Sequence, residues 1–145
     1  MFLPIVSTRR LHRLGSPRNP GAEPRADLRS DRELFVDLRT VSRFVHFYCR
    51  RRHAERPRDR FELKAVDVDA VVGSPVSLCA ECRRLLAHAM TKRLACPMSP
   101  KPACKHCPKH CYHPAYRQRI RKIMRYSGTR MLLTGRLDYL LHVLF

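Results

Sequence analysis

The sequence lacks the long apolar runs and the sorting signals that would place it in or beyond a membrane. No apolar stretch approaches the roughly twenty residues that a membrane-spanning helix needs, and the ending LDYLLHVLF is too short to anchor the chain. The opening MFLPIV precedes its basic residues Arg9, Arg10 and Arg13, which reverses the order found in a secretory signal peptide. We therefore expect a soluble, cytoplasmic protein with no membrane partner.

Signatures of common enzymes are missing too. There is no Ser-His-Asp order, no glycine-rich phosphate loop, no H-E-x-x-H motif and no internal repeat. Asp and Glu number only 12 against 30 Lys and Arg, and they are scarcest where cysteines are dense. These absences argue against a hydrolase or a kinase. They leave redox chemistry, through a metal cluster or a C-x-x-C pair, as the remaining enzymatic role.

Cysteine is what the chain has in an unusual arrangement. Six of its seven cysteines lie in one 33-residue window, as a C-x-x-C pair, a single cysteine and a C-x-x-C-x-x-x-C run. They are Cys79, Cys82, Cys96, Cys104, Cys107 and Cys111, and the seventh is Cys49. A disulfide framework is disfavoured, because an export signal is missing and the count is odd. Since thiolates are strong, soft ligands, the spacing predicts a metal or iron–sulfur site.

One hypothesis is a zinc site made from the two C-x-x-C pairs, Cys79 with Cys82 and Cys104 with Cys107. The 21 residues between the pairs slightly exceed the usual zinc-ribbon spacing of about 15–20. Four tetrahedral ligands would also leave three thiols unused.

An iron–sulfur site uses the cysteines more fully. Cys104, Cys107 and Cys111 lie in a proline-rich loop and can hold three irons of a four-iron four-sulfur cluster, with a fourth ligand from Cys79, Cys82, Cys96 or Cys49. The run differs from the bacterial ferredoxin spacing, so the spacing favours a metal strongly and iron–sulfur only modestly.

Histidines accompany both groups of cysteines. His106, His110 and His113 interleave with the loop cysteines and can ligate or tune a metal, although exposed polar loop positions explain them equally well. Cys49 and His53 lie four residues apart, within one helical turn, yet a helix-surface position is the favoured interpretation of His53.

Hydrophobic periodicity predicts a mainly α, small single domain of three to four helices pinned by cysteine-rich loops. The first helix is expected to begin near Ser30 or Asp31 and to stop at Pro57. The 58–76 segment is expected to be a short strand or loop. Residues 1–30, rich in proline and arginine, are expected to form a disordered basic arm. A start codon assigned too far upstream would explain the same segment. The cysteine-rich helical domain is then 31–145.

Three further helices are expected after residue 76. Ser77 is the predicted N-cap of one that runs to about Leu94. Pro114 is the predicted first residue of the next, and Gly128 its C-cap. A final short helix is expected over roughly 136–144.

Positive charge is uneven along the chain. Residues 101–145 carry ten basic side chains and one acidic side chain, which is half of the net charge of +18. Such a basic segment can attract nucleic acid by neutralising phosphates. It can also offset the negative charge of a thiolate cluster. A solvated helix face is the third explanation, and the preferred one for residues 31–60.

Four segments together resemble the nitrous oxide-stimulated promoter family, small bacterial cysteine-rich proteins. They are Tyr48–His53, Ser77–Leu86, Lys101–Pro114 and Ile120–Leu133. The resemblance covers about residues 38–144 and implies a cytoplasmic iron–sulfur protein that supports growth under nitrosative stress. It also implies that all seven cysteines are candidate ligands.

The sequence thus predicts an iron–sulfur protein, with a sensing or redox role in the nitric oxide stress response and an unidentified redox or regulatory protein partner. One alternative is a zinc-stabilised module whose basic C-terminal helix binds nucleic acid. A thiol redox enzyme is the other.

Overall fold

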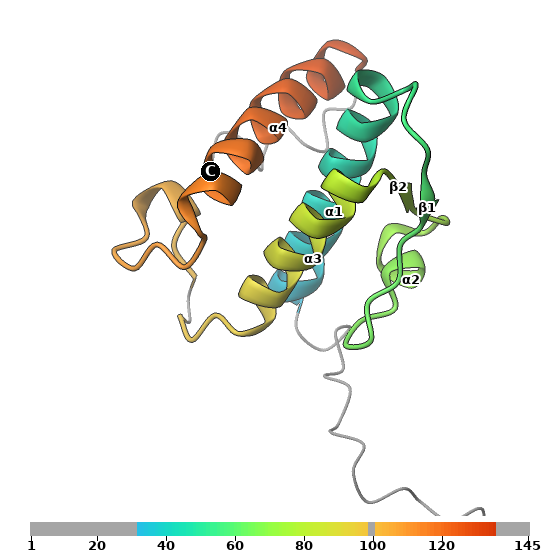
Figure 1. Ribbon diagram of the computed structural model, residues 1–145. Coiled ribbons are helices and arrows are strands. Elements are labelled where there is room, and N and C mark those ends of the chain that lie inside the picture. Colours follow the sequence, from blue (N-terminus) through green and yellow to red (C-terminus); the bar gives the residue numbers. More distant parts are fainter. Residues whose placement is uncertain (1–31, 99–100, 136–145) are drawn as a thin grey trace, which may run out of the picture.

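Four α-helices build most of the described part of the chain, and α1 lies at its centre (Figure 1). The computed structural model describes residues 32–98 and 101–135. In chain order its elements are α1 (Arg32–Arg52), β1 (Asp59–Arg60), α2 (Val68–Val72), β2 (Ser77–Leu78), α3 (Ala80–Leu94), the 3₁₀ turn η1 (Cys104–His106) and α4 (Pro114–Leu133). The predicted mainly helical, small single domain is confirmed.

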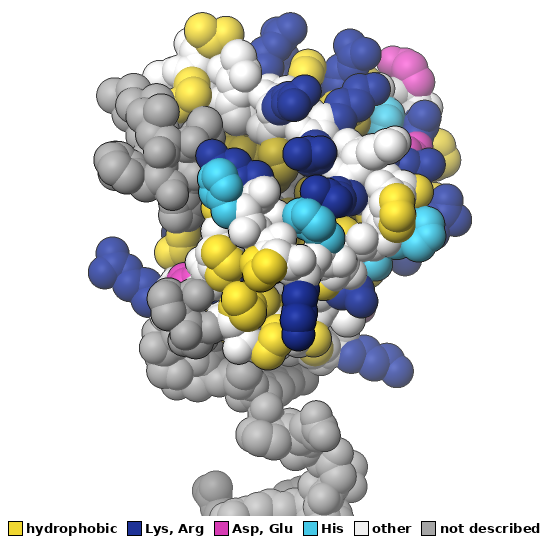
Figure 2. Space-filling view, turned by 90° about the vertical axis from the view of Figure 1, so that its left-hand side faces the viewer, with side chains coloured by type: hydrophobic (Ala, Val, Ile, Leu, Met, Phe, Trp, Pro, Cys, Tyr) yellow, Lys and Arg dark blue, Asp and Glu magenta, His cyan; other side chains and the backbone are white. Residues whose placement is uncertain are grey.

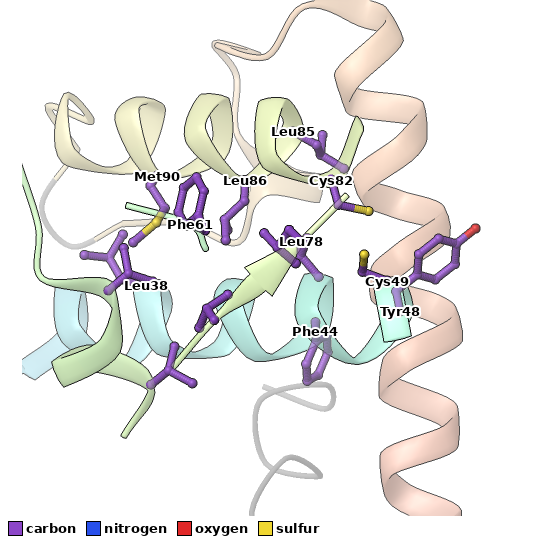
Figure 3. Packing of buried hydrophobic residues seen from close by; sticks show 14 of the residues in the cluster. Leu38, Phe44, Tyr48, Cys49, Phe61, Leu78, Cys82, Leu85, Leu86 and Met90 are labelled. Carbon is purple, nitrogen blue, oxygen red and sulfur yellow. The ribbon is translucent and has the colours of Figure 1, made fainter. Parts of the chain in front are cut away.

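The core forms where α3 and α4 pack on α1. The apolar stripe of α1 includes Leu38, Phe44 and Val45, each no more than 1% exposed. Leu86 of α3 points toward it, as Figure 3 shows, and Leu85 is buried as well. Burial of this kind is worth about 1.5–3 kcal/mol for each large aliphatic side chain. It fixes the C-terminal end of α1 beside the N-terminal end of α3.

Helix α4 approaches α1 closely at two small residues. Ser127 is fully buried and its hydroxyl donates a hydrogen bond of 2.8 Å to the Phe44 carbonyl, while the neighbouring Gly128 is also buried. The prediction that Gly128 ends the helix is therefore wrong, because α4 continues to Leu133. Gly128 lies buried within α4 beside Ser127, which bonds to α1, so the preference of glycine for a helix end does not decide its position here.

The 58–76 segment, expected to be a short strand or loop, contains both the two-residue strand β1 and the short helix α2. Asp67 caps α2 by accepting a hydrogen bond from the Ala70 amide, and Gly73 ends it with a φ of 83°. Val68, Val71 and Val72 all become buried. Their spacing of three and four residues is that of one helix face, whereas the period of two in a strand would put Val68 and Val71 on opposite faces.

The start of α3 also differs from the prediction. Ser77 is not the N-cap, because it lies in β2 and pairs with Arg60 of β1. Cys79 occupies the N-cap position. The strand pair therefore delivers Cys79 and the first turn of α3 to a fixed place.

The end of α1 differs from the prediction, and the beginning of α4 agrees with it. Helix α1 ends at Arg52, five residues before Pro57, whereas Pro114 does stand in the first turn of α4 as predicted. The expected arm over 1–30 and the expected helix over 136–144 lie outside the described residues.

Candidate metal centre

Four potential metal ligands meet where α1 ends and α3 begins. Cys49 lies in the last turn of α1, and His53 follows it by four residues, so that both face the same side. Cys79 is the N-cap residue of α3 and Cys82 lies in its first turn. The Cys79 amide donates a hydrogen bond of 3.3 Å to the Cys49 sulfur, which ties the two helix ends together.

The ligand atoms of these four residues all lie within 4.8 Å of one another. His53 Nδ1 stands 3.4 Å from the sulfur of Cys79 and 3.4 Å from that of Cys82. Ligands of one tetrahedral zinc ion stand roughly 3.5–3.8 Å apart, because Zn–S bonds measure about 2.3 Å and Zn–N bonds about 2.0–2.1 Å. The four residues are therefore positioned to bind one metal ion.

The centre is closed to solvent on most sides. Cys49 is 0% exposed, and Cys79 and Cys82 are each 2% exposed. The ring of Tyr48 packs edge-on against the His53 ring at 5.4 Å. Figure 3 shows the sulfurs of Cys49 and Cys82 at one end of the apolar core. Such burial suits a structural metal site, in which no position is kept open for substrate.

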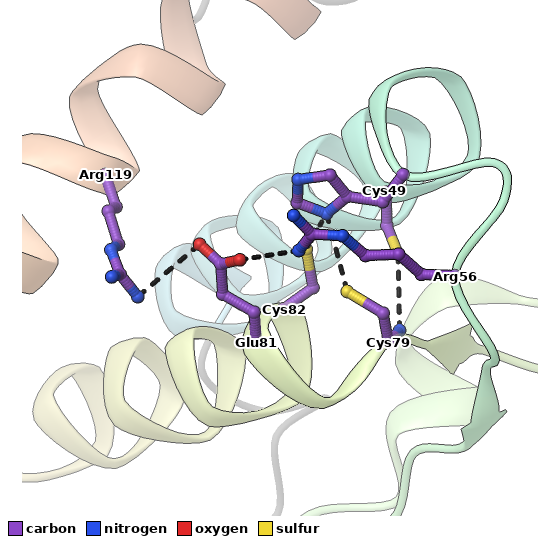
Figure 4. Close-up of polar contacts among 7 residues, drawn as sticks. Cys49, Arg56, Cys79, Glu81, Cys82 and Arg119 are labelled. Carbon is purple, nitrogen blue, oxygen red and sulfur yellow. Dashed lines mark hydrogen bonds and ion pairs between the residues drawn. The ribbon is translucent and has the colours of Figure 1, made fainter.

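Charged side chains form the outer border of the centre (Figure 4). Glu81 accepts a hydrogen bond of 2.6 Å from Arg56 and lies 3.5 Å from the Arg119 guanidinium of α4. This carboxylate therefore links the turn after α1, the first turn of α3 and the side of α4.

The environment acts differently on the three thiols. Burial raises the pKa of Cys49. Burial, with further contributions from Cys49 and Cys79, raises the pKa of Cys82. Burial also opposes ionisation of Cys79, but hydrogen bonds from the Cys82 backbone and from the side chains of Cys82, Cys49 and Arg56 lower its pKa overall. Of these three thiols, Cys79 is therefore the one that ionises most readily.

The histidine is held in its ligating form. Burial, reinforced by the positive charge of Arg56, lowers the pKa of His53, which favours the neutral imidazole that binds metals. At the N-terminus of α3 the helix dipole favours the thiolates of Cys79 and Cys82. A metal ion would still have to displace the protons of Cys49 and Cys82.

A four-iron cluster fits this group of ligands less well than a single ion does. Each cysteine of such a cluster binds a different iron, so the cluster itself separates the ligand atoms. The atoms here converge on one point, and three thiols with one imidazole are an established donor set for structural zinc.

The loop cysteines lie elsewhere in the molecule. The 101–113 segment extends from the far end of α3, away from β2 (Figure 1). Although Cys104 is exposed as a residue, desolvation of its thiol raises its pKa, and Cys111, Asp37 and Cys107 contribute. Its neighbourhood therefore includes the N-terminal half of α1. Within residues 32–98 and 101–135, the loop cysteines join no group of three or more ligands as compact as the one around Cys49.

The expected convergence of Cys79 and Cys82 with Cys104, Cys107 and Cys111 is therefore not what the structure shows. The C-x-x-C pair meets Cys49 instead. Cys96 lies half-buried just after α3.

The loop histidines also have local roles. His110 contacts Arg117 at 3.0 Å, and His113 caps α4 by accepting a hydrogen bond from the Ala115 amide. His106 is exposed in η1.

His53 is the potential ligand that the sequence interpretation missed. Its assignment to the helix surface is wrong, because it is half-buried and faces the thiols. The spacing of four from Cys49 was the available clue, since it places two side chains on one face at a helix end.

Comparisons with known proteins agree with the sequence resemblance. A family model described as "Nitrous oxide-stimulated promoter" matches residues 32–145. The chain is 62% identical over 32 residues to the "Uncharacterized protein YgbA" of Escherichia coli (strain K12). That match covers 22% of this chain and 27% of the relative, so the chain spans only about a quarter of the relative's length. No solved structure matches. Among the described helices, none combines the length and apolar character needed to cross a bilayer.

Proposed function

The chain belongs to the nitrous oxide-stimulated promoter family, and from that premise we propose that it is a metal–thiolate protein of the nitrosative stress response. The observation that carries the proposal is the convergence of Cys49, His53, Cys79 and Cys82 within 4.8 Å. Zinc is the ion that this buried donor set favours.

A zinc ion held by these residues would crosslink α1 to α3 and keep the three sulfurs deprotonated. Thiolate sulfur is also the atom that nitrosating species attack. Dinitrogen trioxide, formed from nitric oxide and oxygen, transfers a nitrosonium group to a thiolate. An S–N bond forms and nitrite leaves, and no proton is involved. A nitrosated cysteine is a poor ligand, so nitrosation would loosen the junction between the two helices.

An iron–sulfur cluster on the loop is the second candidate. The specific observation in its favour is that Cys104, Cys107 and Cys111 share one proline-rich loop, and that the charges of Cys107 and Cys111 affect the Cys104 thiol. Three cysteines can ligate three irons, as the sequence predicts. This cluster would be separate from the compact centre.

Metal analysis separates the two candidates. Protein purified without oxygen, from cells supplied with both iron and zinc, is assayed for zinc, iron and acid-labile sulfide. We expect about one zinc per chain. It should be lost from Cys49→Ala and Cys82→Ala and kept in a triple Cys104→Ser, Cys107→Ser, Cys111→Ser variant. Iron and sulfide that disappear with the loop variant would instead establish the cluster. Zinc retained by Cys49→Ala would refute the compact centre.

The stress role needs a separate test. A bacterial strain deleted for the chromosomal gene is challenged with a nitric oxide donor, and growth is compared after complementation. The wild-type chain should restore growth, the Cys82→Ala chain should not, and Cys96→Ser serves as the matched cysteine control. Equal rescue by Cys82→Ala would contradict a role for the centre in stress tolerance.

A further inference from the structure

One face of α4 carries cations at helical spacing beside the end of α1. Helix α4 contains six Lys and Arg residues and no Asp or Glu. Arg119, Lys122 and Arg130 follow one another at intervals that keep them, with Tyr126, on the same side of the helix. Figure 1 shows this part of α4 running toward the end of α1. Cations from two elements therefore gather in one place.

Tyr126 lies at the centre of this group. The guanidinium of Arg52 stands 5.8 Å from the centre of its ring, and that of Arg130 stands 5.4 Å away. Phe47 lies 6.4 Å from Tyr126, ring centre to ring centre, and carries the Arg51 guanidinium at 5.5 Å. We call this surface the basic–aromatic face; its members are Phe47, Arg51, Arg52, Arg119, Lys122, Tyr126 and Arg130.

Carboxylates neutralise other parts of the domain but hardly this face. Asp37 pairs with Arg93 and Lys101, while Asp59 pairs with Arg83. Among residues 32–98 and 101–135, no carboxylate lies within ion-pair distance of four members of the face. These are Arg51, Arg52, Lys122 and Arg130. On the side of the molecule seen in Figure 2, Lys, Arg and His are plentiful while Asp and Glu are few.

A hollow adjoins the basic–aromatic face. Its volume is about 570 Å³, and it lies between the second half of α1, the end of α2 and the last turns of α4. Phe47 and Arg51 belong to both the face and the hollow, whose lining also includes His46 and Arg50. The hollow therefore offers cationic, imidazole and aromatic groups together, in a space that can admit a planar base.

We infer that the basic–aromatic face and its hollow bind single-stranded nucleic acid. Guanidinium and ammonium groups neutralise phosphates, and bases stack on aromatic rings and on guanidinium planes. A single strand can place its phosphates along the basic–aromatic face and turn a base into the hollow, whereas the bases of a duplex are stacked inside a rigid cylinder. The inference does not rest on the metal or on the proposed stress role, although Arg119 of the face also borders the candidate metal centre through Glu81.

Fluorescence anisotropy tests the inference with a labelled twelve-nucleotide RNA of mixed sequence, using the full chain. Lys122→Glu should weaken binding at least about tenfold, since it removes a phosphate contact and adds repulsion. It should also make the dependence of log K on log salt shallower by about 0.7, the value for one single-strand phosphate contact. Lys64→Glu is the matched control, because it makes the same substitution at an exposed position between β1 and α2. It should leave affinity within about twofold.

Competition identifies what is recognised. Unlabelled single-stranded DNA of the same sequence should compete as well as RNA does, because the phosphates and bases are shared. Duplex DNA and inorganic polyphosphate should compete at least tenfold less well at equal charge. Equal competition by polyphosphate, or equal weakening by Lys64→Glu and Lys122→Glu, would reduce the effect to net charge and overturn the inference. Circular dichroism of each variant confirms that a loss of binding is not a loss of fold.

Discussion

Two groups of cysteines in this chain share the C-x-x-C spacing and have different surroundings. Cys79 and Cys82 open a helix whose first turn is pressed against the end of α1, so they are buried and meet Cys49 and His53. Cys104 begins a 3₁₀ turn in a proline-rich loop and Cys107 ends it, and there they find no such partners among the described residues. Spacing alone therefore identifies a capacity to bind metal, and the packing of neighbouring elements decides which thiols converge.

The largest difference between the groups should be in stability. We expect Cys82→Ala to lower the free energy of unfolding of the metal-loaded protein by more than about 3 kcal/mol, because metal-binding energy is folding energy in small domains. Cys107→Ala, at a partly exposed loop position, should cost less than about 0.5 kcal/mol. Urea unfolding followed by circular dichroism measures both. Equal losses would mean that the loop cysteines contribute as much to the fold as the compact centre.

The second largest difference between the two groups of cysteines should be in how fast their thiols react. In the metal-loaded protein, Cys111 is exposed and should react with a maleimide reagent within minutes, ahead of Cys104, whose desolvated thiol has a raised pKa. Cys49, Cys79 and Cys82 should react only after a chelator is added, because burial and metal binding both protect them. Mass spectrometry of the labelled peptides gives the rate at each position. Rapid labelling of Cys49 without chelator would contradict a closed centre.

A pair of histidine substitutions tests the ligand assignment through a smaller effect, a change in zinc affinity. His53→Gln should weaken zinc binding by at least about tenfold, since it removes one of four ligands while leaving three thiols. His110→Gln removes a histidine from the cysteine-rich loop and should leave zinc affinity unchanged. Competition with a chromophoric chelator measures both constants. If His110→Gln had the larger effect, the site would have to lie on the loop.

Zinc binding at the compact centre should depend on pH. Burial raises the pKa of the Cys49 and Cys82 thiols, so both hold their protons at neutral pH in the metal-free protein. Zinc must displace these protons, and its affinity should therefore rise with pH, with at least about two protons released per ion, from Cys49 and Cys82, and a further fraction from Cys79. Calorimetry in buffers of different ionisation enthalpy counts the protons. Binding without proton release would show that the ligands are already ionised, or that they are not these thiols.

The sequence carried enough information for the helical class and for part of the site. The apolar stripe through Leu38 and Val45 and the proline at 114 predicted two helices correctly, because these patterns depend on local geometry alone. The glycine at 128 misled, since it lies buried within α4 beside Ser127, which bonds to the Phe44 carbonyl of α1. Whether a glycine ends a helix or fits a close contact depends on a neighbour distant in sequence.

The candidate ligands also divide into those that local spacing predicts and those that depend on packing between distant segments. Local spacing correctly drew attention to Cys79 and Cys82. That Cys49 and His53 complete the group depends on how α1 packs against α3 and on the β1–β2 pair that positions Cys79. No pattern within one segment encodes that packing. The C-x-x-x-H spacing of Cys49 and His53 indicates only that these two side chains share one face at a helix end.

X-ray absorption at the zinc edge of the purified protein tests the compact centre most directly. We predict one metal ion surrounded by three sulfurs at about 2.3 Å and one imidazole nitrogen at about 2.0–2.1 Å. The nitrogen scattering should vanish in His53→Gln and persist in His110→Gln. A shell of four sulfurs, or an iron edge with iron–iron scattering, would contradict a mononuclear site formed by Cys49, His53, Cys79 and Cys82.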